Sequence, residues 1–342
     1  MGVKVVELKK ENNLPVLVNY AISGDSGSLL QSDGLEVLDG QVEGVISGTL
    51  KSGKFSTKRS VIGIPSFLSL ISFIELPEMP DSEIEQAVKF EAAKYIPTPL
   101  DEVSLGWEVV GSFQNKSLEG GQPVNRGRKL QIMIVSVPKI TVERYGKIAK
   151  ETGLESVAME VSNFAAVRCL IGNDKGTFMI VDIGAKSTDL TVVSDGVLRV
   201  TRSIDVGGSE ISRSLASGLG IDLQRADKLK KSSRINLLNS RDEISRLIAP
   251  SIGLITVEIK RLIEIYHKKN PLKKVEALVF AGGSSRMSTL IDLFSKELSI
   301  ECRLGNPLAR IAYDEKYKDV LTDTASELTV GIGLAMRGLE DK

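Results

Sequence analysis

The sequence predicts an α/β protein. In both halves of the chain, short apolar runs typical of strands alternate with longer stretches whose apolar spacing is that of amphipathic helices. The chain has 342 residues, enough for about two domains, and 42% of them are hydrophobic, as a globular protein with a sizeable core requires. Two glycine-bearing turns in the second half follow apolar strand patterns, which places candidate binding loops at strand ends.

The first half is predicted to begin with two strands, residues 3–8 and 15–22, joined by a charged turn at 9–13. Gly, Ser and Asp dominate residues 24–34, which favours a loop, and the apolar spacing over 35–50 predicts a helix. The remaining elements of this half are predicted as strands at 59–65, 68–76, 103–112 and 129–137 and as helices at 80–95 and 139–152.

The helix over residues 80–95 has clear start and stop signals. Asp81 or Ser82 can cap its first turn, and Pro97 prevents its continuation. Residues 114–128 are polar and glycine-rich and separate two strands that are expected to pair. We therefore expect a mobile loop there.

The second half is predicted to begin near Gly153. Its longest helix, 241–268, contains Pro250, which should kink it, and a further helix is expected to begin at Ser285 and run to about Leu298. The other elements are predicted as strands at 154–159, 277–281 and 300–303, a hairpin at 177–202, and helices at 161–170, 207–219, 223–231 and 327–339.

Composition excludes several classes of function. Lys and Arg together number 44, as do Asp and Glu, so there is no basic excess of the kind that nucleic-acid binding usually needs. Cys169 and Cys302 lie in apolar patterns and are expected to be reduced, buried thiols. The one histidine, His267, cannot build a histidine-based metal site and suits a basic helix end. No signal peptide is visible, so a cytoplasmic location is expected.

The two glycine-bearing turns are suited to a split nucleotide site. Residues 179–193 form a strand, a small-residue turn and a second strand, and residues 277–287 form a strand followed by Gly282, Gly283 and Ser284. Small residues let backbone N–H groups approach a phosphate or a sugar closely. Asp182 could hold Mg²⁺ through water, or it could simply form a turn, and the second motif could be an ordinary strand-to-helix turn.

Several further motifs resemble one family, the type IV pilus assembly protein PilM, which belongs to the actin-like superfamily. The similarity extends over nearly the whole chain in the same order. The segments that carry it are residues 61–66, Leu-Pro-Glu-Met-Pro at 76–80, Glu-Ala-Ala-Lys-Tyr-Ile-Pro at 91–97, residues 201–208 and residues 331–338.

The resemblance implies a bilobed actin-like (ribonuclease H-like) fold that binds ATP and Mg²⁺. One lobe would be 1–152, with a small inserted α+β subdomain at about 80–137, and the other lobe would be 153–342. Hydrolysis is expected to be weak or absent, and no catalytic residue is assigned. The residues implied in nucleotide binding are Asp182 (also Mg²⁺ through water), Gly184, Ser187, Thr188, Asp189, Gly207, Gly208, Asp227, Lys230, Gly282, Gly283 and Ser284.

The resemblance also implies a partner. PilM-like proteins bind the short cytoplasmic N-terminal peptide of PilN, an inner-membrane protein, so this chain is expected at the membrane only through partners. The peptide groove is expected to be bordered by residues 80–97. Ile84, Val88 and Phe90 could line it or could be core residues. Other cytoplasmic pilus components and a homo-oligomer are further expected partners.

One departure from the family pattern concerns the start of the chain. Family members open with a strand, Asp-x-Gly and a second strand, whereas residues 2–8 here resemble the second strand. Either the start is misplaced, which we favour, or the chain is an adaptor with weakened nucleotide binding. The alternative functions are an FtsA-like filament-forming ATPase and, less favoured, a sugar-kinase-like phosphotransferase, for which no catalytic base can be assigned.

Overall fold

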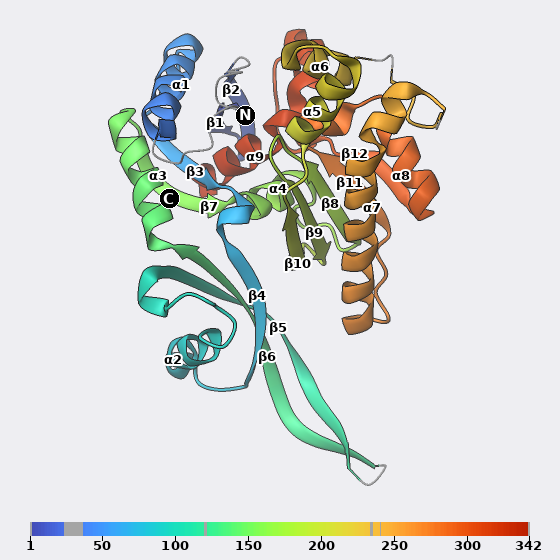
Figure 1. Cartoon of the computed structure of the whole chain (residues 1–342). Coiled ribbons are helices and arrows are strands. Elements are labelled where there is room, and N and C mark those ends of the chain that lie inside the picture. The colour runs from blue at the N-terminus through green and yellow to red at the C-terminus, as the bar shows by residue number, and fades with distance from the viewer. Residues whose placement is uncertain (1, 24–36, 120–121, 233–234, 240, 341–342) are drawn as a thin grey trace. The chain divides into compact units, whose positions relative to one another are not determined.

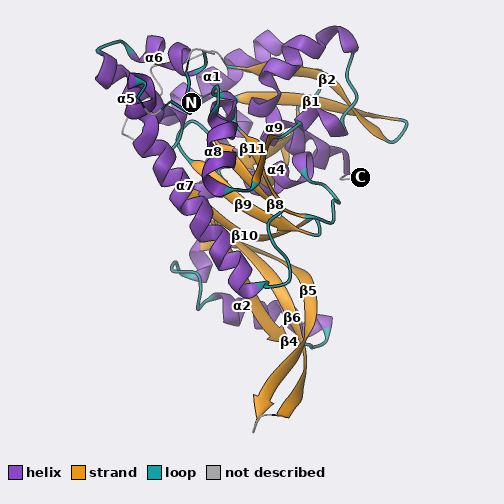
Figure 2. Ribbon diagram, turned by 90° about the vertical axis from the view of Figure 1, so that its right-hand side faces the viewer, coloured by secondary structure: helices purple, strands orange, loops and turns teal. Residues whose placement is uncertain are grey.

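The structure is a computed structural model that describes residues 2–23, 37–119, 122–232, 235–239 and 241–340 (Figures 1 and 2). Strands and helices alternate through these residues, so the α/β prediction is confirmed. The chain divides into two compact units, one formed by Met1–Ile64 with Lys147–Lys342 and the other by Pro65–Gly146. We call them the main unit and the small unit. The lobe boundary expected at residues 152 and 153 stays a prediction.

The main unit contains a five-stranded sheet in the order β10-β9-β8-β11-β12. Its strands are β8 (Thr177–Ile183), β9 (Thr188–Ser194), β10 (Val197–Ile204), β11 (Ala277–Ala281) and β12 (Glu301–Leu304). β8 pairs antiparallel with β9 and parallel with β11. The prediction of a single hairpin at 177–202 is wrong in one respect, because a second tight turn divides these residues into three strands. Asp195 and Gly196 take left-handed conformations there, with φ of 57° and 77°.

Helices pack on this sheet and bury its apolar side chains. Met179, Leu190 and Phe280 of the sheet join Ile255 and Ile259 of the longest helix in one buried cluster. The helices are α4 (Ser162–Leu170), α5 (Gly208–Leu219), α6 (Leu223–Lys230), α7 (Glu243–Lys269), α8 (Leu290–Leu298) and α9 (Lys318–Glu340).

Two predicted helix starts are wrong. Ser285 lies in a short 3₁₀ turn, η4 (Gly283–Arg286), and the α-helix that follows begins only at Leu290. α9 begins at Lys318 rather than at residue 327. The first turns of α9 are polar and weakly periodic, so the local sequence pattern did not reveal them. They are held by long-range packing, because Leu321 and Ala325 belong to a buried cluster that includes Cys169 of α4. Pro250 lies within α7, which continues through it.

The rest of the main unit forms two strand pairs. β1 (Lys4–Glu11) and β2 (Leu14–Ile22) are antiparallel, and β3 (Arg59–Ile64) and β7 (Glu155–Val161) are parallel. The turn predicted at 9–13 is shorter: Asn12 and Asn13 alone connect the strands, both with positive φ, as a two-residue hairpin requires. α1 (Val37–Gly53) also belongs to the main unit, and α3 (Lys139–Glu151) begins in the small unit and ends in the main unit. The loop predicted at 24–34 lies outside the described residues.

These two pairs have the arrangement of the five-stranded sheet without its central strand. In that sheet an antiparallel pair, β9 and β10, and a parallel pair, β11 and β12, flank β8. β1-β2 and β3-β7 correspond to the two flanking pairs, and no described strand joins them. α9 packs on both: a Cβ at Gly331 would lie 2.9 Å from Val6, and one at Gly338 would lie 3.3 Å from Val61.

The small unit contains a three-stranded sheet, one complete helix and the first part of α3. The strands are β4 (Leu70–Pro77), β5 (Val103–Glu119) and β6 (Gln122–Pro138) in the antiparallel order β4-β6-β5, and the helix is α2 (Asp81–Ala92). Ile84 and Val88 of α2 are buried against Ile132 and Ile134 of β6. The unit therefore has a core of its own.

Two predictions for the small unit are wrong. The loop predicted at 114–128 is an extension of β5 and β6, whose pairing continues to Glu119 and Gln122. Backbone pairing between adjacent strands does not require an apolar pattern, so the polar composition concealed it. α2 ends at Ala92 instead of residue 95, and the residue before its first turn is Pro80, with no side-chain cap, instead of Asp81 or Ser82.

Among the residues that the structure describes, no helix combines the length and the apolar character needed to cross a bilayer.

Candidate functional site

The two glycine-bearing turns meet at one end of the five-stranded sheet. β8 and β11 are parallel neighbours, and Asp182 at the end of β8 is in register with Ala281 at the end of β11. The turns that follow these strands, residues 184–187 and 282–286, therefore leave the same edge of the sheet. The carboxyl ends of parallel strands are a frequent location of ligand sites in α/β proteins.

Gly282 brings the second turn against the first. Its φ is +83°, a conformation that side chains with a Cβ rarely adopt. A Cβ there would collide with the carboxylate of Asp182 and the carbonyl of Ile183. The Gly282 N–H donates to the carbonyl of Ser326 on α9 at 3.0 Å. Only glycine fits this junction of β8, β11 and α9.

The start of α5 holds the first turn in place. The N–H groups of Gly208 and Ser209 donate to the carbonyls of Gly184 and Ala185, at 2.9 and 2.8 Å. A Cβ at Gly207 would lie 2.7 Å from the Ala185 carbonyl oxygen, so this contact also depends on glycine. The Thr188 hydroxyl, which is fully buried, donates to the carbonyl of Val206 at 2.7 Å and joins β9 to the same segment.

A buried lysine connects α6 to the start of α5. Lys230 is 4% exposed, and its Nζ donates to the Gly208 carbonyl and the Ser212 hydroxyl, both at 2.9 Å. It also pairs with the Asp227 carboxylate at 2.7 Å. Burial opposes the negative charge of Asp227, but the hydrogen bonds and charges of Lys230 and Lys231 outweigh it and lower the pKa of Asp227 to about 2.

Two carboxylates face each other across β8 and β9. Asp182 and Asp189 are directly paired in register. The pKa of Asp182 is raised to about 7. Burial among the surrounding protein atoms is the largest cause, although the residue keeps some solvent exposure, and the charge of Asp189 adds to it. The positive charge of Lys4 acts in the opposite direction. A cation near this pair would relieve their repulsion.

The structure brings the sequence-predicted residues together around Gly208. A Cβ there would collide with the Ser284 hydroxyl of the second turn and would lie 3.0 Å from Nζ of Lys230. Thus the first turn, the second turn, α5 and α6 meet at one place. The predicted residues that share it are Asp182, Gly184, Ser187, Thr188, Asp189, Gly207, Gly208, Asp227, Lys230, Gly282, Gly283 and Ser284.

Sequence reasoning missed two contributors. Ser212 lies one helical turn after Gly208, and its hydroxyl bridges Lys230 and Asp227, with 3.1 Å to the Asp227 carboxylate. That spacing on a predicted helix was a usable signal. Glu327 lies 3.1 Å from where a Cβ of Gly283 would be, but its helix was predicted only from that residue onward, so nothing local placed it here.

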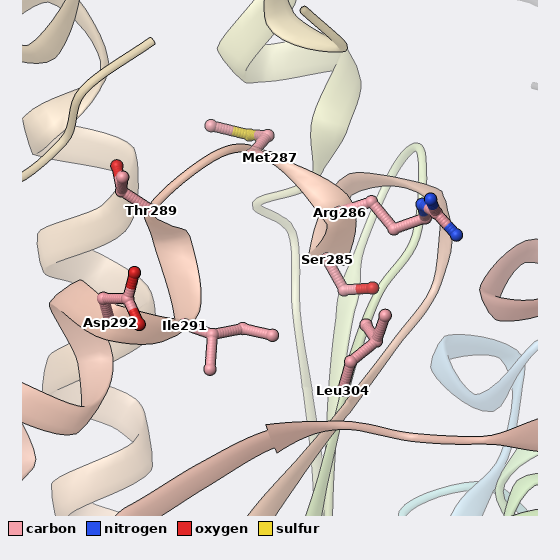
Figure 3. A pocket seen from close by; sticks show the side chains of 7 residues that line it. All are labelled: Ser285, Arg286, Met287, Thr289, Ile291, Asp292 and Leu304. Carbon is pink, nitrogen blue, oxygen red and sulfur yellow. The ribbon is translucent and has the colours of Figure 1, made fainter. Parts of the chain in front are cut away.

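A pocket of about 240 Å³ adjoins the second turn (Figure 3). Its walls come from η4, the start of α8 and the end of β12, and they mix apolar and polar side chains. The residues that line the pocket, labelled in Figure 3, are Ser285, Arg286, Met287, Thr289, Ile291, Asp292 and Leu304.

The small unit settles the two alternatives left open for α2. Ile84 and Val88 are buried core residues, 4% and 0% exposed, whereas Phe90 is 74% exposed. The outer face of the helix also carries ion pairs, such as Lys89 with Glu85 at 2.6 Å, as expected for a solvated surface. Of the three apolar residues proposed for a groove, only Phe90 is available to a partner.

Comparison with known proteins identifies the family. The family model described as type IV pilus assembly protein PilM matches residues 1–339. The chain belongs to the PilM family. A solved structure entitled "PilM-PilN type IV pilus biogenesis complex" superposes with a TM-score of 0.81 at 25% identity, covering 99% of this chain and 96% of that one. The actin-like fold and the PilM resemblance inferred from the sequence are thereby confirmed.

The curated relatives match a smaller part of this chain than the PilM family model does. Cell division protein FtsA of Neisseria meningitidis is 23% identical over 255 residues, which are 67% of this chain and 61% of that protein. FtsA of Agrobacterium fabrum is 25% identical over 150 residues, 37% of this chain and 34% of that protein. The chain thus spans between about a third and three fifths of the length of these relatives.

Proposed function

We propose that this PilM-family protein is an ATP-binding adaptor in type IV pilus assembly, held at the inner-membrane face through a PilN-like protein. The observation that carries the proposal is the match to the PilM family over residues 1–339, supported by the likeness to a PilM-PilN complex over nearly the whole chain. The convergence of two glycine-bearing turns and a buried lysine supports the nucleotide part.

The residues around Gly208 suit a nucleotide with a bound magnesium ion. Lys230 would offer a buried positive charge to a phosphate, in exchange for one of its present partners. Asp182 would hold Mg²⁺ through water, because a cation offsets the repulsion between Asp182 and Asp189. Among the described residues, no group of three or more His, Cys, Asp or Glu could hold a metal by itself. The phosphates and water would therefore complete the magnesium coordination.

Calorimetric titration of ATP into this chain, with and without Mg²⁺, tests the nucleotide part. We expect binding that needs Mg²⁺ and that falls at least tenfold in Asp182→Ala and in Lys230→Met. Asp101→Ala is the matched control, because Asp101 is exposed and belongs to the small unit, whereas the cluster lies in the main unit. If the folded protein binds no ATP, or if the control variant loses as much affinity for ATP as the site variants do, the nucleotide part of the proposal is wrong. The protein would then be an adaptor that does not bind ATP.

The small unit offers a surface to a partner peptide. β5 is an edge strand, and its Trp107 and Val109 are 38% and 41% exposed. Both are in register with residues of β6 that pack against α2, so they lie on the face of the sheet that carries α2. An extended peptide could pair with the backbone of β5 and place apolar side chains near these residues and Phe90. We propose this surface for the N-terminal cytoplasmic peptide of a PilN-like protein.

Fluorescence titration with such a peptide tests the surface, because Trp107 is the one tryptophan of the chain. We expect a saturable change in its emission and a Kd raised at least tenfold by Phe90→Ala or Val109→Ser. Leu238→Ala, a similarly exposed apolar residue of the main unit, should leave the Kd unchanged. If Leu238→Ala raises the Kd as much as the surface variants do, the peptide binds elsewhere.

An FtsA-like filament is the second candidate, since FtsA proteins are among the curated relatives. It predicts sedimentation that increases with protein concentration when ATP and Mg²⁺ are present. The adaptor predicts no such increase, so sedimentation in the presence and absence of ATP separates the two.

A further inference from the structure

A concentrated group of lysines begins in the last turn of α7 and continues beyond it. Within residues 268–274, which we call the basic turn, four of seven residues are lysine, and no acidic residue lies between His267 and Val275. All four lysines are exposed. Because the whole chain carries equal numbers of acidic and basic residues, this concentration of positive charge is local.

An apolar side chain projects from the middle of the basic turn. Leu272 is 97% exposed, more than any other large apolar residue described. Hydrogen bonds hold the backbone on both sides of it. The Lys273 N–H donates to the Asn270 carbonyl at 3.1 Å, the Asn270 N–H donates to the Tyr266 carbonyl at 2.9 Å, and the Val275 N–H donates to Nε2 of His267 at 3.0 Å. An ordered turn thus presents Leu272 to solvent.

Three acidic groups near the basic turn are engaged within the protein. Asp195 pairs with both Lys273 and Arg199. The Glu276 carboxylate accepts a hydrogen bond from the Thr177 N–H at 2.9 Å, and the Asp174 carboxylate accepts one from the Gly176 N–H at 2.9 Å. These three carboxylates keep their negative charge, but the four lysines of the basic turn, together with Arg199 and Lys175, which acts electrostatically on Asp195, outnumber them. Positive charge therefore predominates on this surface.

The position of the basic turn separates it from the candidate nucleotide site. It leads into the first residue of β11, whereas the nucleotide cluster follows the last residues of β8 and β11. The two surfaces therefore lie at opposite ends of the same sheet, and a partner at one leaves the other accessible.

Helix electrostatics account for only part of this surface. Lys268 and Lys269 lie in the last turn of α7, where cations stabilise the helix dipole. Lys273, Lys274 and Lys175 lie outside the helix and gain nothing from it. An apolar side chain surrounded by cations is the pattern of proteins that rest on an anionic bilayer, where the cations contact phosphate headgroups and the apolar group enters the acyl boundary.

We propose that the basic turn contacts an anionic membrane surface directly, with Leu272 inserted between the headgroups. A nucleic acid is the less suitable occupant, because a phosphodiester backbone gives no role to an exposed leucine at the centre of the lysines. This contact requires neither a bound nucleotide nor a bound peptide. It adds a direct membrane contact to the one through a partner that the sequence predicts.

Vesicle co-sedimentation tests the electrostatic part. The full chain should bind vesicles of phosphatidylcholine with 30% phosphatidylglycerol, should not bind vesicles of phosphatidylcholine alone, and should be released by 0.5 M salt. A lysine near the surface contributes about a fivefold factor, so Lys268→Gln/Lys269→Gln/Lys274→Gln should weaken partitioning about a hundredfold. The control Lys10→Gln/Lys139→Gln/Lys318→Gln changes the net charge equally at exposed sites elsewhere and should weaken it far less.

Fluorescence tests the insertion. In a Trp107→Phe background, Leu272→Trp should show a blue-shifted emission when anionic vesicles are added, and Leu272→Ser in the natural background should partition less. Equal losses in the two triple variants would overturn the assignment to the basic turn. Binding to duplex DNA without binding to vesicles would overturn the choice of a membrane, and an unshifted tryptophan would overturn insertion.

Discussion

At the scale of single residues, the site depends on backbone approaches that only glycine permits and on charges placed close together. Gly207, Gly208 and Gly282 each occupy a position where a Cβ would meet another segment within 3 Å. Asp182 and Asp189 are adjacent carboxylates in a packed environment. Both features cost stability, as binding sites commonly do.

Asp182→Asn should stabilise the protein when neither nucleotide nor Mg²⁺ is present. The pKa of Asp182 is raised to about 7 in the folded state, so the folded chain binds more protons than the unfolded chain between about pH 4 and pH 7, and stability falls as the pH rises through that range. At pH 8 the amide should therefore gain roughly 1–2 kcal/mol, and at pH 5 less. Thermal unfolding in EDTA at both pH values measures this. Asp205→Asn, at an exposed position, is the control, and a loss of stability at pH 8 would contradict the electrostatic account.

Gly282→Ala should destabilise the main unit by about 2–4 kcal/mol, because it adds backbone strain and a collision with Asp182 and Ile183. Gly253→Ala is the matched control. Gly253 lies in α7 with nothing within 4 Å of an added Cβ, so alanine should stabilise that helix by about 0.5–1 kcal/mol. Urea unfolding of both variants measures the contrast, and effects of the same sign would argue against it.

At the scale of elements, the described residues of the two halves of the main unit differ by one strand. β8 connects an antiparallel and a parallel strand pair, whereas β1-β2 and β3-β7 lie against α9 without a described strand between them. An unpaired strand edge leaves backbone N–H and C=O groups without ladder partners. These edges define a place that an added strand would fit, antiparallel to β1 and parallel to β3.

A seven-residue strand with the pattern of β8, fused through a short turn before Gly2, should therefore stabilise the first half. New ladder bonds and apolar contacts with α9 should raise Tm by several degrees and slow amide exchange in β1 and β3. The control fusion has the same length with its apolar residues replaced by Ser and Asn. If both fusions leave exchange in β1 and β3 unchanged, the edges are not open to a strand.

At the scale of the whole molecule, the two units have separate cores. The buried cluster of Ile84, Val88, Ile132 and Ile134 lies entirely within the small unit, and the large cluster on the five-stranded sheet lies entirely within the main unit. The chain passes between the units at residues 64–65 and 146–147. Separate cores predict local stabilities that can change independently.

Val88→Ala should lower the stability of the small unit by about 1–3 kcal/mol, because Val88 is fully buried there. Hydrogen exchange should quicken in β4, β6 and α2 and stay unchanged in β8 and β11. Leu215→Ala, a fully buried residue of the main unit, should give the opposite pattern. Faster exchange throughout the chain in either variant would show that the units unfold together.

Local sequence predicted those parts of the protein in which apolar spacing and turn chemistry agree. The buried strands β8 and β11 belong to this group, because each is an apolar run that ends at a glycine. The start of α5 also belongs to it, because an amphipathic pattern begins at Gly208. The candidate site residues were also named from their motifs. The polar strand extensions of residues 114–128 and the early turns of α9 were missed, because backbone pairing and distant packing stabilise them.

The sequence by itself determined the class, the family motifs and the choice of candidate site residues, because these depend on residue types at short spacings. Only the tertiary structure decided which of them meet. The contact of Gly208 with Ser284 and Lys230 joins residues up to 76 positions apart, and the burial of Val88 beside the exposure of Phe90 depends on which face of α2 covers the sheet. Long-range packing sets such contacts, and local spacing carries no record of it.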